Sequence, residues 1–266
     1  MKTRIKVLIL LVLFIGCKQN KENNQSNAQS IESQKGIEIT LTKVINSPSY
    51  KSASLLLDSI KIKNKQNGYG EVNFNFNVSN YELGVITKSE NTSILANSSK
   101  GQHIHFILDN QPYSAHYENR FTKEVQNGVH HLVAFLSRSY HESVKNNNSI
   151  VIKKLVVGEN PQDELVQDIN APTLIYSRPK GKYVGKDANR ILLDFFILNT
   201  ELKENGNKVK ATINNKVFMI TDWTPYIISG LPFGEVSIKL ELIDNQGANI
   251  DGPFNAVERK ILLVKS

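Results

Sequence analysis

The chain has 266 residues, with 32 lysines and arginines against 25 aspartates and glutamates, which gives a formal net charge of +7. The basic residues are scattered and form no cluster interleaved with aromatic residues, so the charge does not indicate a nucleic-acid-binding protein. Asparagine is abundant, alanine is scarce, and β-branched and aromatic residues recur in short runs. This composition favours strands and turns over helices.

The first 17 residues have the pattern of an export signal. Basic residues at positions 2, 4 and 6 precede an apolar run at 7–15, which is too short to span a bilayer by itself. The segment 13–17, LFIGC, resembles the lipobox of bacterial lipoproteins, although a residue smaller than Phe14 is more usual there. The resemblance implies a signal peptide at 1–16, cleavage after Gly16 and a diacylglycerol on the sulfur of Cys17. The alternative is an ordinary cleaved signal followed by an incidental cysteine.

Cys17 is the only cysteine of the chain, which excludes an intrachain disulfide and agrees with its use as a lipid anchor. The segment 17–36 is rich in Asn, Gln, Ser, Lys and Glu. It cannot bury enough apolar surface to offset its ordering entropy, so we expect a flexible tether. Removal of the signal lowers the side-chain charge by three, to +4.

The remaining chain of about 230 residues is long enough for two ordinary domains. Strands are predicted where apolar and polar residues alternate or where β-branched residues run together. In the first half they lie at 37–42, 55–62, 72–78, 103–109, 112–118, 130–136 and 150–157. The segment 159–172 is polar and acidic and contains two prolines. It is therefore predicted as a linker between a domain at 37–158 and a second domain at 173–266.

The two halves align in three ungapped blocks, which indicates a duplicated domain. Residues 76–83 align with 195–202, with a Phe, an Asn, a Glu and a Leu in common. The other aligned blocks are 104–110 with 209–215 and 128–136 with 234–242. Each half has about seven short strands, so we predict an all-β protein with two tandem immunoglobulin-like or fibronectin-III-like β-sandwiches.

Three features together resemble lipoproteins of the Bacteroidetes type with tandem immunoglobulin-like domains. They are the lipobox, the Asn- and Lys-rich composition, and Asp58-Ser59-Ile60, which is similar to the short O-glycosylation signal of exported Bacteroidetes proteins. The resemblance implies a cell-envelope protein anchored by lipid, on the periplasmic side or on the surface. We expect a non-enzymatic binding or adhesion module with an envelope protein or a glycan as partner. An enzyme is not expected, because no nucleophile or acid–base set emerges.

All six histidines lie between positions 103 and 141. Because side chains alternate along a strand, His103 and His105 are expected to point away from the core. The repeat alignment places His130 inward and His131 outward. The strands that carry these residues are neighbours in an immunoglobulin-like topology, so His103, His105 and His131 are predicted to meet on one outer sheet face.

Three interpretations of this face stay open. Three imidazoles from neighbouring strands form a ligand set for Zn or Cu, so His103, His105 and His131 are a candidate divalent-metal site. The same face is also a candidate ligand or partner surface, through Ile107, Val133, Phe135, His116 and Glu118. Such an apolar patch is typical of a surface covered by the second domain or by a partner. The third interpretation is purely structural, with polar residues on a solvated or covered face.

Overall fold

The computed structural model describes residues 38–65, 67–166 and 168–265. Ile37–Ser266 forms a compact unit of its own that contains all the described strands. The predicted signal peptide, Cys17 and the tether lie outside the described residues. No helix among the described residues is long and apolar enough to cross a membrane.

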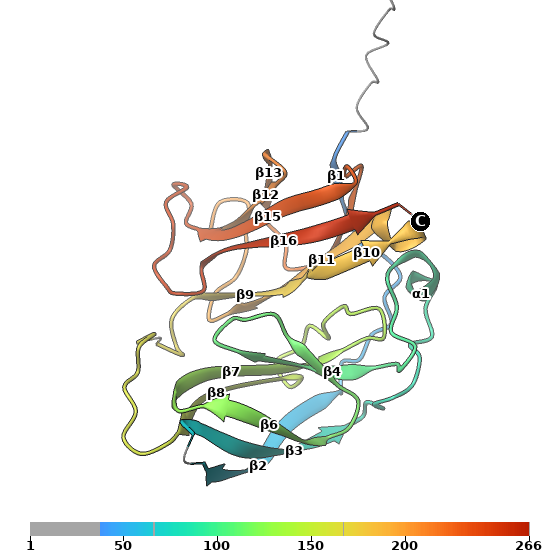
Figure 1. Cartoon of the computed structure of the whole chain (residues 1–266). Helices are drawn as coiled ribbons and strands as arrows, with labels where there is room; N and C mark the ends of the chain where they lie inside the picture. The colour runs from blue at the N-terminus through green and yellow to red at the C-terminus, as the bar shows by residue number, and fades with distance from the viewer. Residues whose placement is uncertain (1–37, 66, 167, 266) are drawn as a thin grey trace, which may run out of the picture. The chain divides into compact units, whose positions relative to one another are not determined.

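The first half of this unit is a β-sandwich of two antiparallel sheets, with strand orders β2-β3-β6 and β5-β4-β7-β8 (Figure 1). The strict alternation predicted at 72–78 places Val72, Phe74 and Phe76 of β3 in the core between the sheets. From β7, Leu132, Ala134 and Leu136 enter the same core. The bounds are β2 Ser54–Asn64, β3 Tyr69–Ser79, β4 His103–Leu108, β5 Ser114–His116, β6 Arg120–Gln126, β7 Gly128–Ser137 and β8 Ile150–Val157, with one helical turn, α1 Asn91–Ile94, before β4.

The second half is another sandwich, with sheets β1-β14-β11-β9 and β10-β16-β15-β12-β13. The edge strand β10 pairs with β16 in parallel, and the other pairs are antiparallel. The bounds are β9 Thr173–Arg178, β10 Gly181–Val184, β11 Arg190–Leu198, β12 Lys208–Ile213, β13 Lys216–Ile220, β14 Tyr226–Ser229, β15 Gly234–Ile243 and β16 Ala256–Val264, with a 3₁₀ turn at Gly185–Ala188. The chain is therefore an all-β protein of tandem fibronectin-III-like sandwiches, as predicted.

The strand predicted at 37–42 is present as β1, Thr40–Lys43, but it belongs to the other sandwich. It pairs with β14, so that Leu41 lies opposite Ile228. The domain span 37–158 is wrong in this respect, because the first strand of the span completes a sheet of the second sandwich. Alternation along a sequence identifies a strand but not its partner, since pairing depends on contacts far away in the chain.

The repeat alignment matches the topology of the two sandwiches. The aligned blocks lie on β3 and β11, on β4 and β12, and on β7 and β15, which occupy equivalent places in their sheets. The hairpins that follow β4 and β12 turn through Asp109-Asn110 and Asn214-Asn215, and all four residues have positive φ between 45° and 72°. Two successive positive φ angles define the two-residue turn that suits the twist of a hairpin, and Asn and Asp tolerate them best. The same turn chemistry thus recurs at the aligned positions.

The outer face of the sheet β5-β4-β7-β8 packs against the outer face of β9 and β11. Their side chains form one buried apolar cluster, made of Ile107, Tyr113, Val133, Phe135, Ile175, Phe196, Leu198 and Phe254. A polar contact adds to it, because the buried carboxylate of Asp194 accepts hydrogen bonds from the backbone N–H and hydroxyl of Ser143 and from the ammonium of Lys145. The sheets therefore succeed one another as layers, with the histidine-bearing face of β4 inside the stack (Figure 1).

Candidate metal centre

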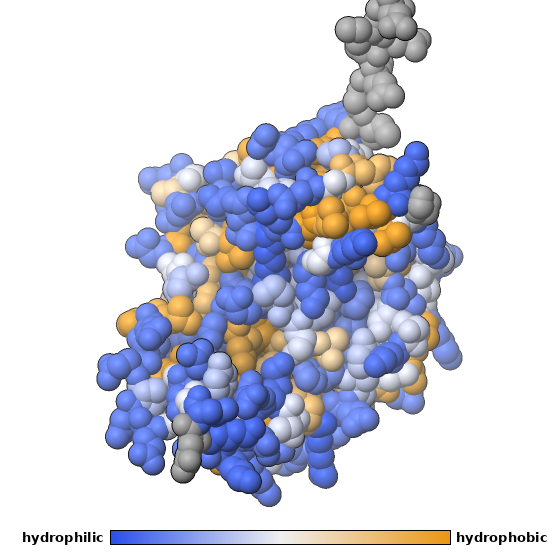
Figure 2. All heavy atoms as spheres, in the orientation of Figure 1, coloured by the Kyte–Doolittle hydropathy of each residue, from blue (hydrophilic) through white to orange (hydrophobic). Residues whose placement is uncertain are grey.

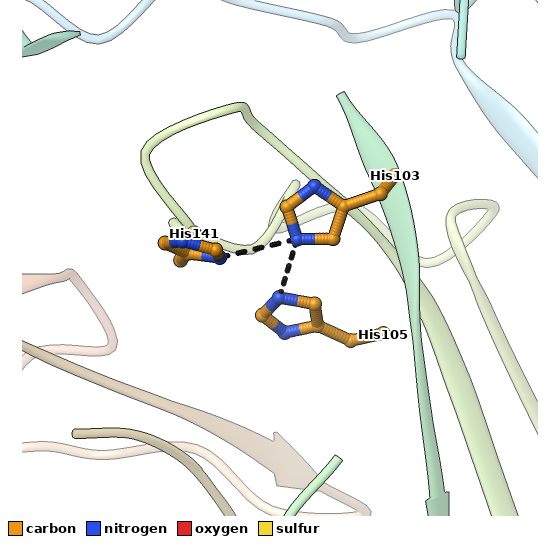
Figure 3. Close-up of side chains that lie close together, drawn as sticks. All are labelled: His103, His105 and His141. Carbon is orange, nitrogen blue, oxygen red and sulfur yellow. Dashed lines mark hydrogen bonds between the residues drawn. The ribbon is translucent and has the colours of Figure 1, made fainter. Parts of the chain in front are cut away.

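Three histidines converge between the two sandwiches: His103, His105 and His141 (Figure 3). Nε2 of His103 lies 2.9 Å from Nε2 of His105 and 3.2 Å from Nδ1 of His141. One nitrogen from each ring lies within 4.8 Å of the other two. His103 and His105 are fully buried, whereas His141 is partly exposed. We refer to these three residues as the histidine trio.

The local chain explains how the trio forms. His103 and His105 stand two residues apart on β4 and so share its outer face. His141 comes from the turn after β7, where the N–H of Arg138 donates to the carbonyl of Glu142 and the N–H of His141 donates to the carbonyl of Arg138. Because Ser137, the last residue of β7, lies opposite His103, this turn brings His141 back over the beginning of β4.

His131 does not belong to the site, which corrects the predicted set His103, His105 and His131. It does face outward, but the antiparallel register pairs His103 with Ser137 and Leu108 with Leu132. His131 is thus six residues from the position opposite His103, or about 20 Å along the strand. Its Nε2 lies instead 3.8 Å from a carboxylate oxygen of Asp163. Sequence periodicity gave the correct face but not the correct end of the strand.

His130 is likewise not the core residue that the repeat alignment predicts. Its ring is only partly buried and lies at the beginning of β7. Nδ1 of His130 lies 2.7 Å from Oδ2 of Asp109, and Nε2 lies 2.7 Å from the carbonyl oxygen of Gln126. The contact with Asp109 is the main reason why the pKa of His130 is raised.

The hydrogen bonds around the trio orient its rings for ligation. Nδ1 of His103 is 2.8 Å from the carbonyl oxygen of Gly101, which only accepts, so Nδ1 carries the proton and Nε2 keeps its lone pair. Nδ1 of His105 is 3.2 Å from the hydroxyl of Ser177, which accepts or donates equally well. The Tyr113 hydroxyl lies 3.2 Å from Nδ1 of His141, the nitrogen that faces His103, so it orients this ring only in the absence of a metal. Partners of this kind fix the orientation of ligating imidazoles in metal sites.

The second sandwich supplies two cations beside the trio. The ring of Tyr113 stacks on His105, with 3.5 Å between ring centroids and 13° between planes. The Lys180 ammonium lies 3.8 Å from the centroid of the Tyr113 ring, and the Arg178 guanidinium lies 5.3 Å from it. Arg178 also donates to the hydroxyl of Tyr183, at 2.8 Å. No carboxylate belongs to the trio's ligand group in the described part of the chain.

Burial keeps the trio uncharged at neutral pH. It lowers the pKa of His103 to about 4, and it is the largest cause of the lowered pKa values of His105 and His141. The positive charges of Arg178 and Lys180 lower all three pKa values further. Each ring therefore keeps at least one nitrogen lone pair, which is the form that binds metal.

The ligand or partner face predicted on the first sandwich is not a free surface. Ile107, Val133 and Phe135 are at most 3% exposed, because the second sandwich covers them. His116 faces the first sandwich's own core, where its ring stacks on Phe121 at 3.4 Å. Glu118 alone of the predicted face is exposed. One interpretation of the sequence is that the second domain or a partner covers the apolar patch. For the apolar residues, the second domain is the cover.

Exposed apolar side chains are found on other strands. Figure 2 shows a mostly hydrophilic face that is interrupted by an apolar patch over the paired strands β10 and β16. On these strands Val184 is 49% exposed and Leu262 is 43% exposed. Exposed apolar side chains thus lie on strands of the second sandwich as well as on the first, where Leu56 and Val156 are 60% and 50% exposed.

No family model and no curated protein matches the sequence. Among solved structures, the fibronectin(III)-like modules of Clostridium thermocellum CbhA are 13% identical, with a TM-score of 0.28 over 73% of this chain and 86% of that chain. The central fibronectin-III array of RIM-binding protein is 9% identical, with a TM-score of 0.27 over 84% and 71%. SGBP-B from the mixed-linkage glucan utilization locus of Bacteroides ovatus is 9% identical, with a TM-score of 0.20 over 61% of each chain. At these scores the likenesses add nothing to the sheet topology described above.

Proposed function

We propose that this chain is a non-enzymatic metal-binding lipoprotein of the cell envelope. The folded unit binds one zinc or copper ion through His103, His105 and His141. The observation that carries the proposal is the convergence of three imidazole nitrogens within 4.8 Å of one another, inside the protein. The lipid on Cys17 keeps the folded unit at a membrane, as the lipobox implies.

The spacing of the nitrogens suits a metal ion. Imidazole nitrogens bind zinc at about 2.0–2.1 Å, so two such ligands of one ion are about 3.4 Å apart. Nε2 of His103 lies 2.9 and 3.2 Å from the other two nitrogens, and all three nitrogens lie within 4.8 Å of one another, so rotation of the rings would bring each pair near this distance. Without a metal, the Nε2–H of His105 donates to Nε2 of His103. If a metal bound Nε2 of His105, the ring would carry its proton on Nδ1 instead. The N–H at Nδ1 would then donate a hydrogen bond to the hydroxyl of Ser177.

The test is calorimetric titration of residues 37–266 with Zn(II), Cu(II) and, under anaerobic conditions, Cu(I). This unit contains no cysteine, so no thiol competes for the metal. We expect one equivalent of at least one ion to bind with a dissociation constant of about 1 µM or lower. His105→Ala should abolish the binding, whereas His131→Ala, which removes a buried histidine outside the trio, should preserve it. If the wild-type protein binds none of the three ions, the proposal is wrong.

A second candidate function is recognition of an envelope protein or glycan, and an open groove favours it. The groove has a volume of about 720 Å³ and is lined by Asn147, Ile197, Asn199, Thr200, Glu201, Leu202 and Trp223. An indole beside amide and carboxylate groups offers stacking and hydrogen bonding to a polar ligand such as a sugar. Binding to a glycan array that is lost in Trp223→Ala would support this function, and an array without signal would count against it.

A further inference from the structure

We propose that the ion bound by the histidine trio is monovalent copper, and that the cations of β9 and of the turn after it disfavour Zn(II) and other dications. The inference rests on the proposed function, because it presupposes that the trio binds metal. It goes further by naming the charge of the ion. Three features of the site carry it: the neighbouring cations, the uncharged ligands and the number of ligands.

The first feature is the positive charge beside the site. Lys180 and Arg178 both lie against the ring of Tyr113, and this ring stacks on His105. The two centroid distances place the Lys180 ammonium within about 8 Å of the His105 ring, where unit charges still repel each other appreciably in a protein interior. A dication experiences twice the repulsion that a monocation experiences.

The second feature is that the trio's ligand group contains no carboxylate among the described residues, so no negative charge in it neutralises a dication. The groups that hydrogen-bond the three rings are the carbonyl of Gly101 and the hydroxyls of Ser177 and Tyr113. The Tyr113 phenol carries no charge at neutral pH, since an ordinary phenol ionises only at about pH 10. The cost of taking an ion out of water grows with the square of its charge, so Cu(I) pays about a quarter of the cost of Zn(II) at equal size.

The third feature is the number of ligands. Zinc sites are almost always four-coordinate, and a three-histidine zinc site takes water as its fourth ligand. The trio offers three nitrogens, and two of its rings are fully buried among aromatic side chains, including Tyr113 and Phe135. Cu(I) is satisfied by two or three ligands and needs no water. Imidazole binds both copper and zinc, so charge and coordination number decide rather than donor type.

The experiment compares the affinities of residues 37–266 for Cu(I) and Zn(II). Cu(I) is measured by anaerobic competition with bicinchoninate, and Zn(II) by competition with a chromophoric zinc indicator. We expect one equivalent of Cu(I), with the X-ray absorption edge of a three-coordinate Cu(I)–nitrogen site, and a dissociation constant for Zn(II) at least about a hundredfold higher. Equal or tighter binding of Zn(II) would overturn the inference and leave the proposed function standing. Failure to bind either of these ions or Cu(II) would overturn both.

A charge variant tests the cause of the preference. Cu(I) outcompetes Zn(II) at many nitrogen sites, so the decisive quantity is the change in the gap between the two affinities. Lys180→Gln should narrow this gap by about tenfold, because removing one positive charge relieves a dication twice as much as a monocation. Lys182→Gln is the matched control, since Lys182 is exposed on β10, and it should leave the gap unchanged. A gap that is equally wide in wild-type protein and Lys180→Gln would refute the charge argument.

Discussion

Acidification should destabilise the metal-free protein strongly, because the trio is buried in its uncharged form. Burial lowers the pKa of His103 from 6.5 to about 4, and its side chain has no exposed surface. In the unfolded chain this imidazole takes up a proton as the pH falls below 6.5, whereas in the native state it does so only near pH 4. Each pKa unit corresponds to about 1.4 kcal/mol, so His103 alone should lower the free energy of unfolding by about 2 kcal/mol at pH 5 and about 3 kcal/mol at pH 4.

The other histidines set the sign and the limits of the effect. His105 and His141 have pKa values well below 6.5, so they add to the loss in the same direction. His130 acts in the opposite direction, because the pKa of its ring is raised by the carboxylate of Asp109. Its stabilising contribution is complete below 6.5 and is lost as the pH rises through its folded-state pKa. The trio therefore lowers the free energy of unfolding below pH 6.5. The contribution of His130 changes mainly above pH 6.5, so the two effects fall in different pH ranges.

The assay is urea unfolding of residues 37–266 at pH 7, 5 and 4 in the presence of a chelator. His103→Gln should lose about 2 kcal/mol less between pH 7 and pH 5 than the wild-type protein, whatever its stability at pH 7. His130→Gln provides a control of opposite sign, because without it the loss on acidification should be slightly larger. Parallel pH dependences of His103→Gln and wild-type protein, or a His103 resonance that titrates near 6.5 in the folded protein, would refute the reasoning.

Three further predictions concern the metal, the contact between the sandwiches and the lipid. A hundredfold excess of free Cu(I) over its dissociation constant should stabilise the fold by about 2.7 kcal/mol and raise the melting temperature, and bicinchoninate should reverse the gain; an unchanged melting temperature would contradict binding to the native state. Asp194→Ala should cost about 3–5 kcal/mol in urea unfolding, because it leaves the part-buried ammonium of Lys145 without its carboxylate, whereas Asp222→Ala at an exposed ion pair should cost less than about 1 kcal/mol. Cys17→Ser should abolish palmitate labelling and move the protein to the soluble fraction; a variant that stays with the membrane would contradict the lipid anchor.

The fold class could be predicted because its signals are local. Alternation identified β3, and the paired turns at Asp109-Asn110 and Asn214-Asn215 are visible in the aligned sequences. The immunoglobulin-like topology also predicted that β4 and β7 are neighbours, which is confirmed. The partner of β1 was not predicted, because no local pattern distinguishes an edge strand of one sandwich from that of another.

The site was predicted in part, and the missing part depends on register. The faces of His103, His105 and His131 follow from the two-residue period of a strand, and all three are correct. Which of these side chains come into contact depends on the register of β4 against β7. In the observed register His103 lies opposite Ser137. His141 could have been found only by combining this register with the tight turn that begins at Arg138.

The repeat clarifies why the histidines are informative. At the positions of His103 and His105, the second sandwich has Lys208 and Lys210, which are only partly buried. The corresponding face of the first sandwich is covered, and a lysine there would need a buried partner, so the covering explains the absence of lysine. The covering does not explain why histidines occupy these positions. Phe135, opposite His105 on the same covered face, shows that an apolar ring also fits there. Rings with polar nitrogens at fully buried positions cost free energy unless those nitrogens are bound, and here they point at one another. The rings are hydrogen-bonded to Gly101, to Ser177 and to one another, so the fold keeps three imidazole nitrogens close together at a position where an apolar ring would also pack.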